Sequence, residues 1–578
     1  MEKRLPLFLF LSFLIFVGWE LTFGKKLRPP KPPPAVVQDA APAPSEAAGE
    51  AGSGSGLTGN EEVVRAPASQ ELALEGELAE RTLELEVGGA GTPGTAGRQG
   101  AFRAVFSNRG ASLLELDFAD YMRTVGLDDA QRLDRANWLP LLEPVERAGL
   151  ATGSLVLRTS ASSKELFPAD LETALWKMEP LPAPEAGVRF RYSPPGGKVA
   201  LEKVVRFEPG SWRIGVTLTL ENLAAGTGKG LSFLLVPAAA VPAEIGESFY
   251  GEPNAVAIGR ESSDSPFEID HKPAPGLKEA GALEAHKLLS VVGVHNKYFA
   301  FLLREKEFES GTLGGASYAP LSVDGKPRIE LLAPLNLKLP AQGEARSFEY
   351  VVYAGPKAKD VFVADCAAHQ LVLDDDTSVD SIARLLLWVL GLLHGVLRNW
   401  GLSIIALTLG VRLLLFPLNR RSQTSMAKYQ TKMKRVQPKL EELKKRFEKD
   451  PQKLREGQAR IMQEEGAFPP LGGCLPVFLQ MPVFFGLFSA LRTAFDLRQA
   501  PFYGYITDLS RPDHMFQLPA LPLLPSHFNL LPILMVVLWI VQQMGMPKPA
   551  DEQAARMQKM MMFMPVVFGF MLYNYAAG

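Results

Sequence analysis

The chain has 578 residues, of which 47% are hydrophobic, and a formal net charge of −2. This length leaves room for about two to four domains of ordinary size. The two cysteines, Cys366 and Cys474, lie far apart in the sequence, no CxxC motif occurs, and no histidine belongs to an HExxH motif. These features argue against a disulfide framework, and they predict neither a metal site nor another cofactor.

The N-terminal end carries the first of the long apolar runs. Residues 5–23 form a mainly apolar run 19 residues long, close to the length of about 20 that crosses a bilayer. No small-x-small cleavage site follows, so we predict an uncleaved transmembrane signal-anchor over residues 1–26 rather than a signal peptide. Residues 27–60 are rich in Pro, Ala, Gly and Ser, and they are predicted to form a linker that is stiff at first and flexible later.

Residues 61–370 have the composition of a water-exposed region and the pattern of short strands. Apolar and polar residues alternate over Thr82–Val87, Ala101–Phe106 and Ile214–Leu220, with Gly, Asn and Pro between such segments. Many short strands with turn signals predict an all-β antiparallel sandwich. The region contains no nucleophile elbow, phosphate loop or paired-carboxylate pattern, so we expect binding or spacing and no enzyme activity.

The C-terminal part consists of apolar segments separated by polar ones. Residues 381–399 combine crowded leucines with Arg384, His394 and Arg398, which predicts an amphipathic helix at the membrane interface. The alternative is the upper part of one long, tilted spanning helix. Each of the following segments is long enough to cross the bilayer. They are residues 400–418, 475–491, 530–546 and 560–578.

A basic segment follows the first of these spans. Residues 419–466 hold 14 Lys and Arg against 7 Asp and Glu, and so basic a loop is typical of the cytoplasmic side. This assignment places the β region in the periplasm and the N-terminus in the cytoplasm.

The same segment has the signals of a helical hairpin over residues 420–466. Asp450 and Pro451 supply an N-cap and a first helical residue for the second arm. Leu443 lies on an apolar face suited to packing between the arms. Pro438 is expected to kink or restart the first arm.

Arg412 is the most informative residue because it lies inside an apolar span. An arginine at mid-helix costs about 2.5–3.5 kcal/mol on insertion, so it needs water, an acidic partner or a function. Thr408 lies one turn away on the same face, and together they suggest a polar stripe facing a wet cavity. The alternative is that the long Arg412 side chain snorkels to the interface. The later spans contain no charged residue, which argues against an ion-coupled transporter.

Four stretches have an order and spacing that, taken together, are specific. They are Asn399–Ile405 running on to Arg412 and Pro417, Ser425–Lys428 with Gln437–Lys439, Pro470–Pro476 with Gln480–Pro482, and Asp496–Phe502 with Asp508–Ser510. Together they resemble the YidC family of membrane protein insertases, relatives of the mitochondrial and chloroplast insertases. The layout of anchor, large β region and membrane core is similar too. The resemblance implies an α-helical membrane bundle plus a β-supersandwich-like periplasmic domain.

The resemblance also implies a function in the bacterial inner membrane. Such a protein inserts and helps fold membrane proteins, alone or with the Sec translocon, through a groove open to the cytoplasm and to lipid. Arg412 corresponds to the family's essential arginine, and Thr408, Phe484 and Met535 fall at groove positions. The hairpin corresponds to the helices that receive substrate. Its basic residues are Lys428, Lys432, Lys434, Arg435 and Lys439.

The expected partners are nascent membrane-protein substrates, the lipid bilayer, the Sec translocon, the signal recognition particle receptor and the ribosome, with no direct nucleic-acid specificity. The family has a sixth helix after a short turn, and the given sequence stops at Tyr575–Gly578, where that turn should be. We expect either that the sequence is truncated or that the sixth helix is missing. A second hypothesis is a membrane-anchored periplasmic carbohydrate-binding or enzyme domain. A third is a small-solute transporter, against which the lack of intramembrane carboxylates weighs.

Overall fold

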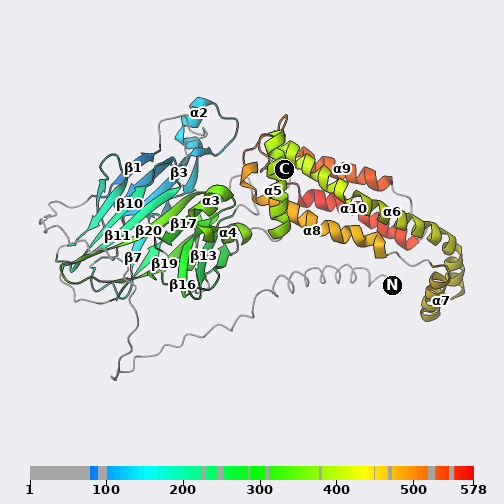
Figure 1. Ribbon diagram of the computed structural model, residues 1–578, viewed down its shortest axis with the longest axis horizontal. Coiled ribbons are helices and arrows are strands. Elements are labelled where there is room, and N and C mark those ends of the chain that lie inside the picture. The colour runs from blue at the N-terminus through cyan, green and yellow to red at the C-terminus, as the bar shows by residue number, and fades with distance from the viewer. Residues whose placement is uncertain are drawn as a thin grey trace, which may run out of the picture. The chain divides into compact units, whose positions relative to one another are not determined.

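The structure is a computed structural model, and it describes most of the chain from residue 79 onward (Figure 1). The described ranges are 79–88, 100–147, 149–167, 169–194, 196–223, 230–243, 252–283, 287–307, 311–375, 380–447, 450–466, 471–518, 527–545 and 552–578. The predicted signal-anchor and linker lie outside these residues.

The first large part of the described chain is an all-β region (Figure 1). Its strands are β1 Thr82–Val87, β2 Phe102–Ser107, β3 Ser112–Met122, β4 Trp138–Leu142, β5 Val145–Arg147, β6 Leu150–Thr152, β7 Val156–Thr159, β8 Lys177–Pro180, β9 Ala186–Tyr192, β10 Val199–Phe207, β11 Arg213–Asn222, β12 Gly230–Val236, β13 Asn254–Arg260, β14 Glu268–Pro273, β15 Gly281–Ala282, β16 Leu288–His295, β17 Phe299–Glu305, β18 Ser317–Val323, β19 Lys326–Lys338 and β20 Ala345–Pro356. A short helix α2, Asp129–Leu133, interrupts them.

Three larger sheets and a two-stranded sheet, β5-β6, make up the described part of this region, and all their pairings are antiparallel. A nine-stranded sheet runs in the order β14-β13-β16-β17-β20-β11-β10-β9-β8, a five-stranded sheet in the order β15-β18-β19-β12-β7, and a four-stranded sheet in the order β1-β2-β3-β4. The three alternating segments that the sequence singled out coincide with strands β1, β2 and β11, apart from Ala101, which directly precedes β2. The all-β prediction for this region is therefore confirmed.

The strands form because alternate side chains enter one shared core. Along β10 and β11, buried residues alternate with more exposed ones, as expected for strands with one face on a core. Aromatic rings from different sheets meet in that core. The rings of Phe102 and Phe207 lie 5.7 Å apart, and Trp212 meets Phe102 edge-on at 5.8 Å.

The second large part of the described chain is helical, which confirms the predicted combination of a β domain with a helical core. Its long helices are α5 Asp380–Leu397, α6 Trp400–Arg446, α7 Pro451–Glu464, α8 Leu471–Thr493, α9 Leu530–Met544 and α10 Glu552–Met571. Two short helices, α3 Lys359–Asp365 and α4 Gln370–Asp375, lead into it from the β region. A two-residue ladder, β21 Phe516–Gln517 with β22 His527–Phe528, precedes α9.

Helix α6 is longer than the span expected from the apolar pattern. Asn399 caps it, since its side chain accepts a hydrogen bond from the backbone N–H of Leu402 at 3.0 Å. The helix then continues past Pro417 and Pro438 to Arg446. The apolar run ends near Leu418, but the helix continues beyond it. Pro417 and Pro438 each remove one helical hydrogen bond, and neither ends the helix.

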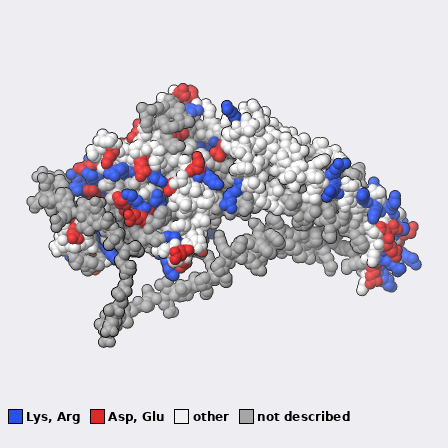
Figure 2. All heavy atoms as spheres, in the orientation of Figure 1, with Lys and Arg blue, Asp and Glu red and all other residues white. Residues whose placement is uncertain are grey.

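The helical part exposes many large apolar side chains. Leu414, Val396 and Phe570 are 78%, 81% and 87% exposed. Within the described residues, α6 is long and apolar enough to cross a membrane by length and composition, and three shorter apolar helical stretches accompany it. Figure 2 shows charged side chains over the β region and again at the α6–α7 end, with a largely uncharged surface between them on the face in view.

Candidate functional site

Helix α6 packs through one face and leaves the adjoining positions open. Leu407 is buried in a cluster with Leu386 and Leu390 of α5, and Val411 lies against the same cluster. Thr408 is half-buried at the edge of this contact, and Arg412 is exposed. Because Leu407 and Val411 face α5, Thr408 and Arg412 lie on the adjoining face of α6. Residues four apart on a helix share a face, so Thr408 and Arg412 point the same way.

Arg412 lies among exposed apolar side chains. Its neighbours Leu413 and Leu414 are 72% and 78% exposed. Within the part of the chain that the structure describes, no hydrogen bond or ion pair reaches the Arg412 guanidinium. An unpaired cation on an apolar helix is costly in hydrocarbon, so the surroundings of this side chain must supply water or a charged partner.

The other two predicted groove residues lie on other helices. Phe484 of α8 is 51% exposed and stacks near Phe488, with ring centroids 6.3 Å apart. Met535 of α9 is half-buried. None of the described hydrogen bonds, ion pairs or ring contacts joins Arg412, Thr408, Phe484 and Met535 to one another. That these residues share one groove therefore stays a prediction.

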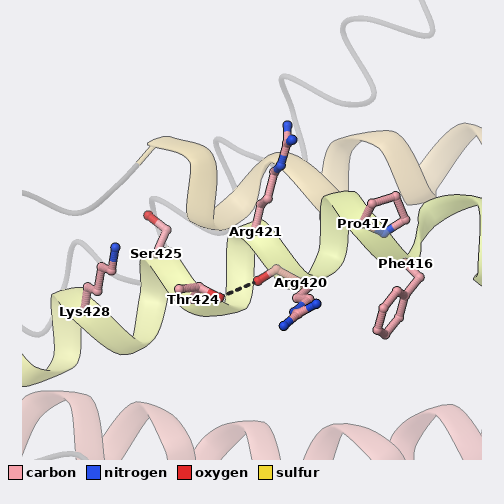
Figure 3. A pocket seen from close by; sticks show the side chains of 7 residues that line it. All are labelled: Phe416, Pro417, Arg420, Arg421, Thr424, Ser425 and Lys428. Carbon is pink, nitrogen blue, oxygen red and sulfur yellow. Dashed lines mark hydrogen bonds between the residues drawn. The ribbon is translucent and has the colours of Figure 1, made fainter.

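Beyond Arg412, the surface of α6 is hollowed over about 570 Å³. The hollow is lined by Phe416, Pro417, Arg420, Arg421, Thr424, Ser425 and Lys428. In Figure 3, Arg421, Ser425 and Lys428 point to one side of the helix and Phe416 and Arg420 to the other. Of these residues only Lys428 belonged to the predicted basic set. Many of the lining residues are three, four or seven positions apart in the sequence. On one helix this spacing places residues on the same face, so the sequence could have identified them as a set.

The predicted hairpin is present as the end of α6 followed by α7. Asp450 accepts hydrogen bonds from the backbone N–H groups of Gln452 and Lys453, each at 3.2 Å, so the predicted N-cap is confirmed. A Cβ on Gly457 of α7 would lie 2.8 Å from Leu443 of α6, which confirms the predicted packing of Leu443 between the arms.

The predicted basic residues of the hairpin are all exposed, and two of them tie its arms together. Lys439 pairs with Glu465, and this hydrogen-bonded contact raises the pKa of Lys439 and lowers that of Glu465. Lys432 donates to the carbonyl of Gly466 at 3.3 Å. Lys428, Lys434 and Arg435 have no ion pair among the described residues, so these cations stay open to other partners.

The segment between α8 and α9 forms a network of hydrogen bonds that the sequence analysis did not find. One carboxylate oxygen of Asp508 accepts from the backbone N–H groups of Gln499 and Ser510, both at 2.9 Å. Asp513 accepts from the backbone N–H groups of Leu530 and Leu531 at 2.7 and 3.1 Å, and so caps α9. Carboxylates with several backbone donors hold such loops firmly.

The same segment also touches the β region. The guanidinium of Arg498 lies over the ring of Phe299 at 5.0 Å and near the ring of Tyr121 at 5.9 Å. Gln499 donates to the carbonyl of Met122, at the end of β3, at 2.7 Å. Phe495 meets the ring of Phe299 edge-on at 5.7 Å. These contacts join distant parts of the sequence through a buried cation and a small aromatic cluster.

Comparison with known proteins adds to this geometry. Residues 392–578 match the family model described as 60Kd inner membrane protein. The chain is 26% identical to the membrane protein insertase YidC of Syntrophus aciditrophicus over 100% of this chain and 96% of that protein. It is 28% identical to the YidC of Neisseria meningitidis over 68% of this chain and 69% of that protein.

The chain is thus similar over its whole length to YidC-type insertases. The expected resemblance is thereby confirmed, and the protein is an inner-membrane protein of a family that is not a family of enzymes. A galactose mutarotase related enzyme from Lactobacillus acidophilus matches 47% of this chain and 97% of that structure, with 11% identity and a TM-score of 0.27. That likeness is too weak to carry an argument about activity.

Two of the four YidC-like stretches meet in space. A Cβ on Gly401, at the start of α6, would overlap the ring of Phe502 in the segment after α8. Leu509, which follows Asp508, is buried in a cluster with Trp400 and Ile404. The stretches around Asn399 and Phe502 therefore pack against each other.

Proposed function

We propose that this protein inserts membrane proteins by offering their polar outer segments a hydrated cation, Arg412, on an otherwise apolar helix. The observation that carries the proposal is the exposed Arg412 side chain on α6, between exposed leucines and without an ion pair among the described residues. A transient contact with an acidic substrate segment shortens the distance over which that segment must cross hydrocarbon. Nothing in this step makes or breaks a covalent bond.

The proposal extends to the groove. Thr408 adds a hydroxyl beside Arg412, while Phe484 and Met535 supply apolar surface for the substrate helix. Methionine and phenylalanine suit a surface that accepts many sequences, because the contacts they make are non-directional and adaptable. The exposed cations Lys428, Lys434 and Arg435 lie further along the same helix, where a substrate arriving from the ribosome would meet them first.

We propose further that α6, α8, α9 and α10 cross the bilayer, with the hairpin in the cytoplasm and the β region in the periplasm. The basic hairpin supports this orientation. The proposed partners are the Sec translocon, the signal recognition particle receptor and the ribosome. A membrane-impermeant thiol reagent applied to intact cells should label Ser265→Cys in the β region and spare Thr431→Cys in the hairpin. The reverse pattern contradicts this orientation.

The arginine proposal is tested with proteoliposomes that contain the full chain and a short substrate with an acidic N-terminal tail. We expect Arg412→Ala to reduce insertion about tenfold or more, because a charge-assisted contact contributes about 1.5–3 kcal/mol. Protection of the tail from added protease measures insertion. Arg446→Ala, at the exposed end of the same helix, is the matched control and should insert normally.

A second substrate with a neutral tail sharpens the test. If Arg412 acts on acidic residues, neutralising the tail should remove most of the difference between Arg412→Ala and the unchanged protein. Full insertion of the acidic substrate by Arg412→Ala, at a normal protein level, contradicts the proposal.

A further inference from the structure

The hollow on α6 lies at the boundary between the apolar and the basic part of this helix. Phe416 and Pro417 form its apolar end, and Arg420, Arg421 and Lys428 surround the rest with positive charge. Figure 3 shows cations on both sides of the helix ridge, with Arg420 on one side and Arg421 and Lys428 on the other. The hollow is apolar at one end and cationic at the other. A phospholipid has the same arrangement where its glycerol and acyl chains meet its phosphate.

The cations of the hollow are left uncompensated. The sequence contains no Asp or Glu between Arg412 and Leu440. Among the described residues, Arg420, Arg421 and Lys428 have no side-chain hydrogen bond or ion pair. By contrast, the hairpin beyond them pairs Lys439 with Glu465, Lys453 with Asp450 and Arg460 with Glu464. On α6 itself Lys439 is neutralised in this way, whereas Arg420, Arg421 and Lys428 stay available to an anion from outside, as do Lys434 and Arg435 further along the helix.

Two hydroxyl groups complete the lining. The Thr424 hydroxyl donates to the backbone carbonyl of Arg420 at 2.8 Å. The hydroxyl proton of Thr424 is therefore used, and its oxygen can still accept a hydrogen bond. Ser425 lies between Arg421 and Lys428 on the same side and can donate to an anion. Arginine suits this place because its planar fork matches two oxygens of a phosphate. A volume of about 570 Å³ is in the range of small-molecule sites.

We propose that this hollow is a binding site for the phosphate headgroup of an anionic phospholipid. Basic pockets at the cytoplasmic end of spanning helices bind acidic lipid headgroups, and each nearby cation adds to the affinity. The bound lipid would anchor α6 at the membrane surface, next to the stretch that carries Arg412. The inference rests on the proposed crossing of the bilayer by α6.

The test measures lipid binding to the purified full chain in detergent by native mass spectrometry. The probes are palmitoyl-oleoyl-phosphatidylglycerol, which is anionic, and palmitoyl-oleoyl-phosphatidylcholine, which has no net charge. Each cation contributes about fivefold in affinity, so the double variant Arg420→Gln with Arg421→Gln should bind phosphatidylglycerol about thirtyfold more weakly. The double variant Lys444→Gln with Lys445→Gln, which has the same charge change away from the hollow, should bind it normally.

Three outcomes would overturn the proposal. The first is equal weakening in both double variants, which means general electrostatic attraction. The second is equal binding of the two lipids. The third is a Glu-rich peptide that competes with the lipid at lower concentration and depends on the same two arginines, which identifies the hollow as a peptide site. Displacement by inorganic phosphate only at far higher concentration supports a whole lipid as the ligand.

The readout separates this proposal from the insertion mechanism. Lipid binding is measured without substrate, so it can fail while Arg412 still supports insertion, and the reverse also holds. Circular dichroism of both double variants establishes that they are folded. Exposed arginines on a helix surface tolerate substitution by glutamine, which keeps the helix-forming character and most of the side-chain length.

Discussion

The β region and the helical region differ in how their arginines are paired and in how much apolar surface they expose. In the β region, Arg158 is held by Glu172 and Glu330 at 2.8 and 2.6 Å, and the Glu330 side chain is only 3% exposed. In the helical region, Arg412 and Arg420 carry no partner among the described residues, while Leu414 is 78% exposed. The first pattern belongs to a domain that must be stable in water. The second fits the proposal that this surface meets lipid and passing substrates.

The difference shows where each part draws its stability. A water-exposed sandwich buries its apolar faces and pairs the charges that it cannot expose. Helices in a membrane gain little from hiding leucines from lipid, so their packing depends on close fit and on small residues. The prediction from this comparison is that charge changes disturb the β region most and that shape changes disturb the helical region most.

The largest effect is expected at Glu330. Replacing it by alanine removes the partner shared by Arg147 and Arg158, both 2.6 Å from its carboxylate, and leaves Glu172 as the remaining carboxylate beside the two arginines. The free energy of unfolding of the β region should fall by about 3 kcal/mol, because two charge-assisted contacts of about 1.5–3 kcal/mol each are lost. Hydrogen exchange of strands β12 and β19 in the full chain measures this. Glu202→Ala, which removes an exposed pair with Arg191, should cost less than about 1 kcal/mol.

A pH dependence is expected from Lys203, which is fully buried. Burial lowers the pKa of Lys203 to about 7, and its amine donates to the carbonyls of Ala111 and Leu155. The unfolded chain, with an ordinary lysine pKa of about 10.4, binds more protons above pH 7. The stability of the β region should therefore rise by about 1.4 kcal/mol per pH unit between these two values.

Below about pH 7, Lys203 is protonated in both states, and its contribution to this slope ends. Unfolding of the full chain followed at several pH values measures the effect. Lys203→Met should remove the slope, because methionine does not titrate. A slope that survives in Lys203→Met assigns it to other groups and contradicts the prediction.

In the helical region a single methyl group should matter. Gly401→Ala places a Cβ against the Phe502 ring, which cannot move aside easily because it packs in the cluster with Leu509. Overpacking of this kind costs about 1–3 kcal/mol. The expected result is a lower melting temperature of the full chain and faster exchange at the start of α6. Gly410→Ala, where a Cβ meets open space, is the matched control.

The smallest effect is expected where the two regions touch. Arg498→Ala removes the cation over Phe299 and Tyr121, a contact worth about 0.5–2 kcal/mol. Exchange should increase at the end of β3, near Met122, with little change in the core of either region. Arg498→Lys keeps the charge but loses the planar group, so an intermediate result is expected. Unchanged exchange in Arg498→Ala would show that the contact contributes nothing to stability.

Local sequence patterns predicted much of the fold. Alternation over Thr82–Val87 and Ile214–Leu220 located strands β1 and β11, and the Asp450-Pro451 pair located the start of α7. Near Leu418 the composition changes from apolar to polar, but the helix continues to Arg446. The site was predicted only in part. Arg412 and Lys428 were singled out because one lies in an apolar run and the other in a basic run, and their roles stay predictions.

The sequence by itself determined which segments are strands, which are apolar helices and where isolated cations fall, because hydrophobic periodicity is a property of neighbouring residues. Only the tertiary structure decided that Gly401 meets Phe502, that Arg498 lies over Phe299, and that Arg420 and Arg421 flank one hollow. The first two depend on the close approach of segments that are far apart in the chain. The third depends on which face of α6 its neighbours leave uncovered, and the spacing of residues along one helix does not reveal that.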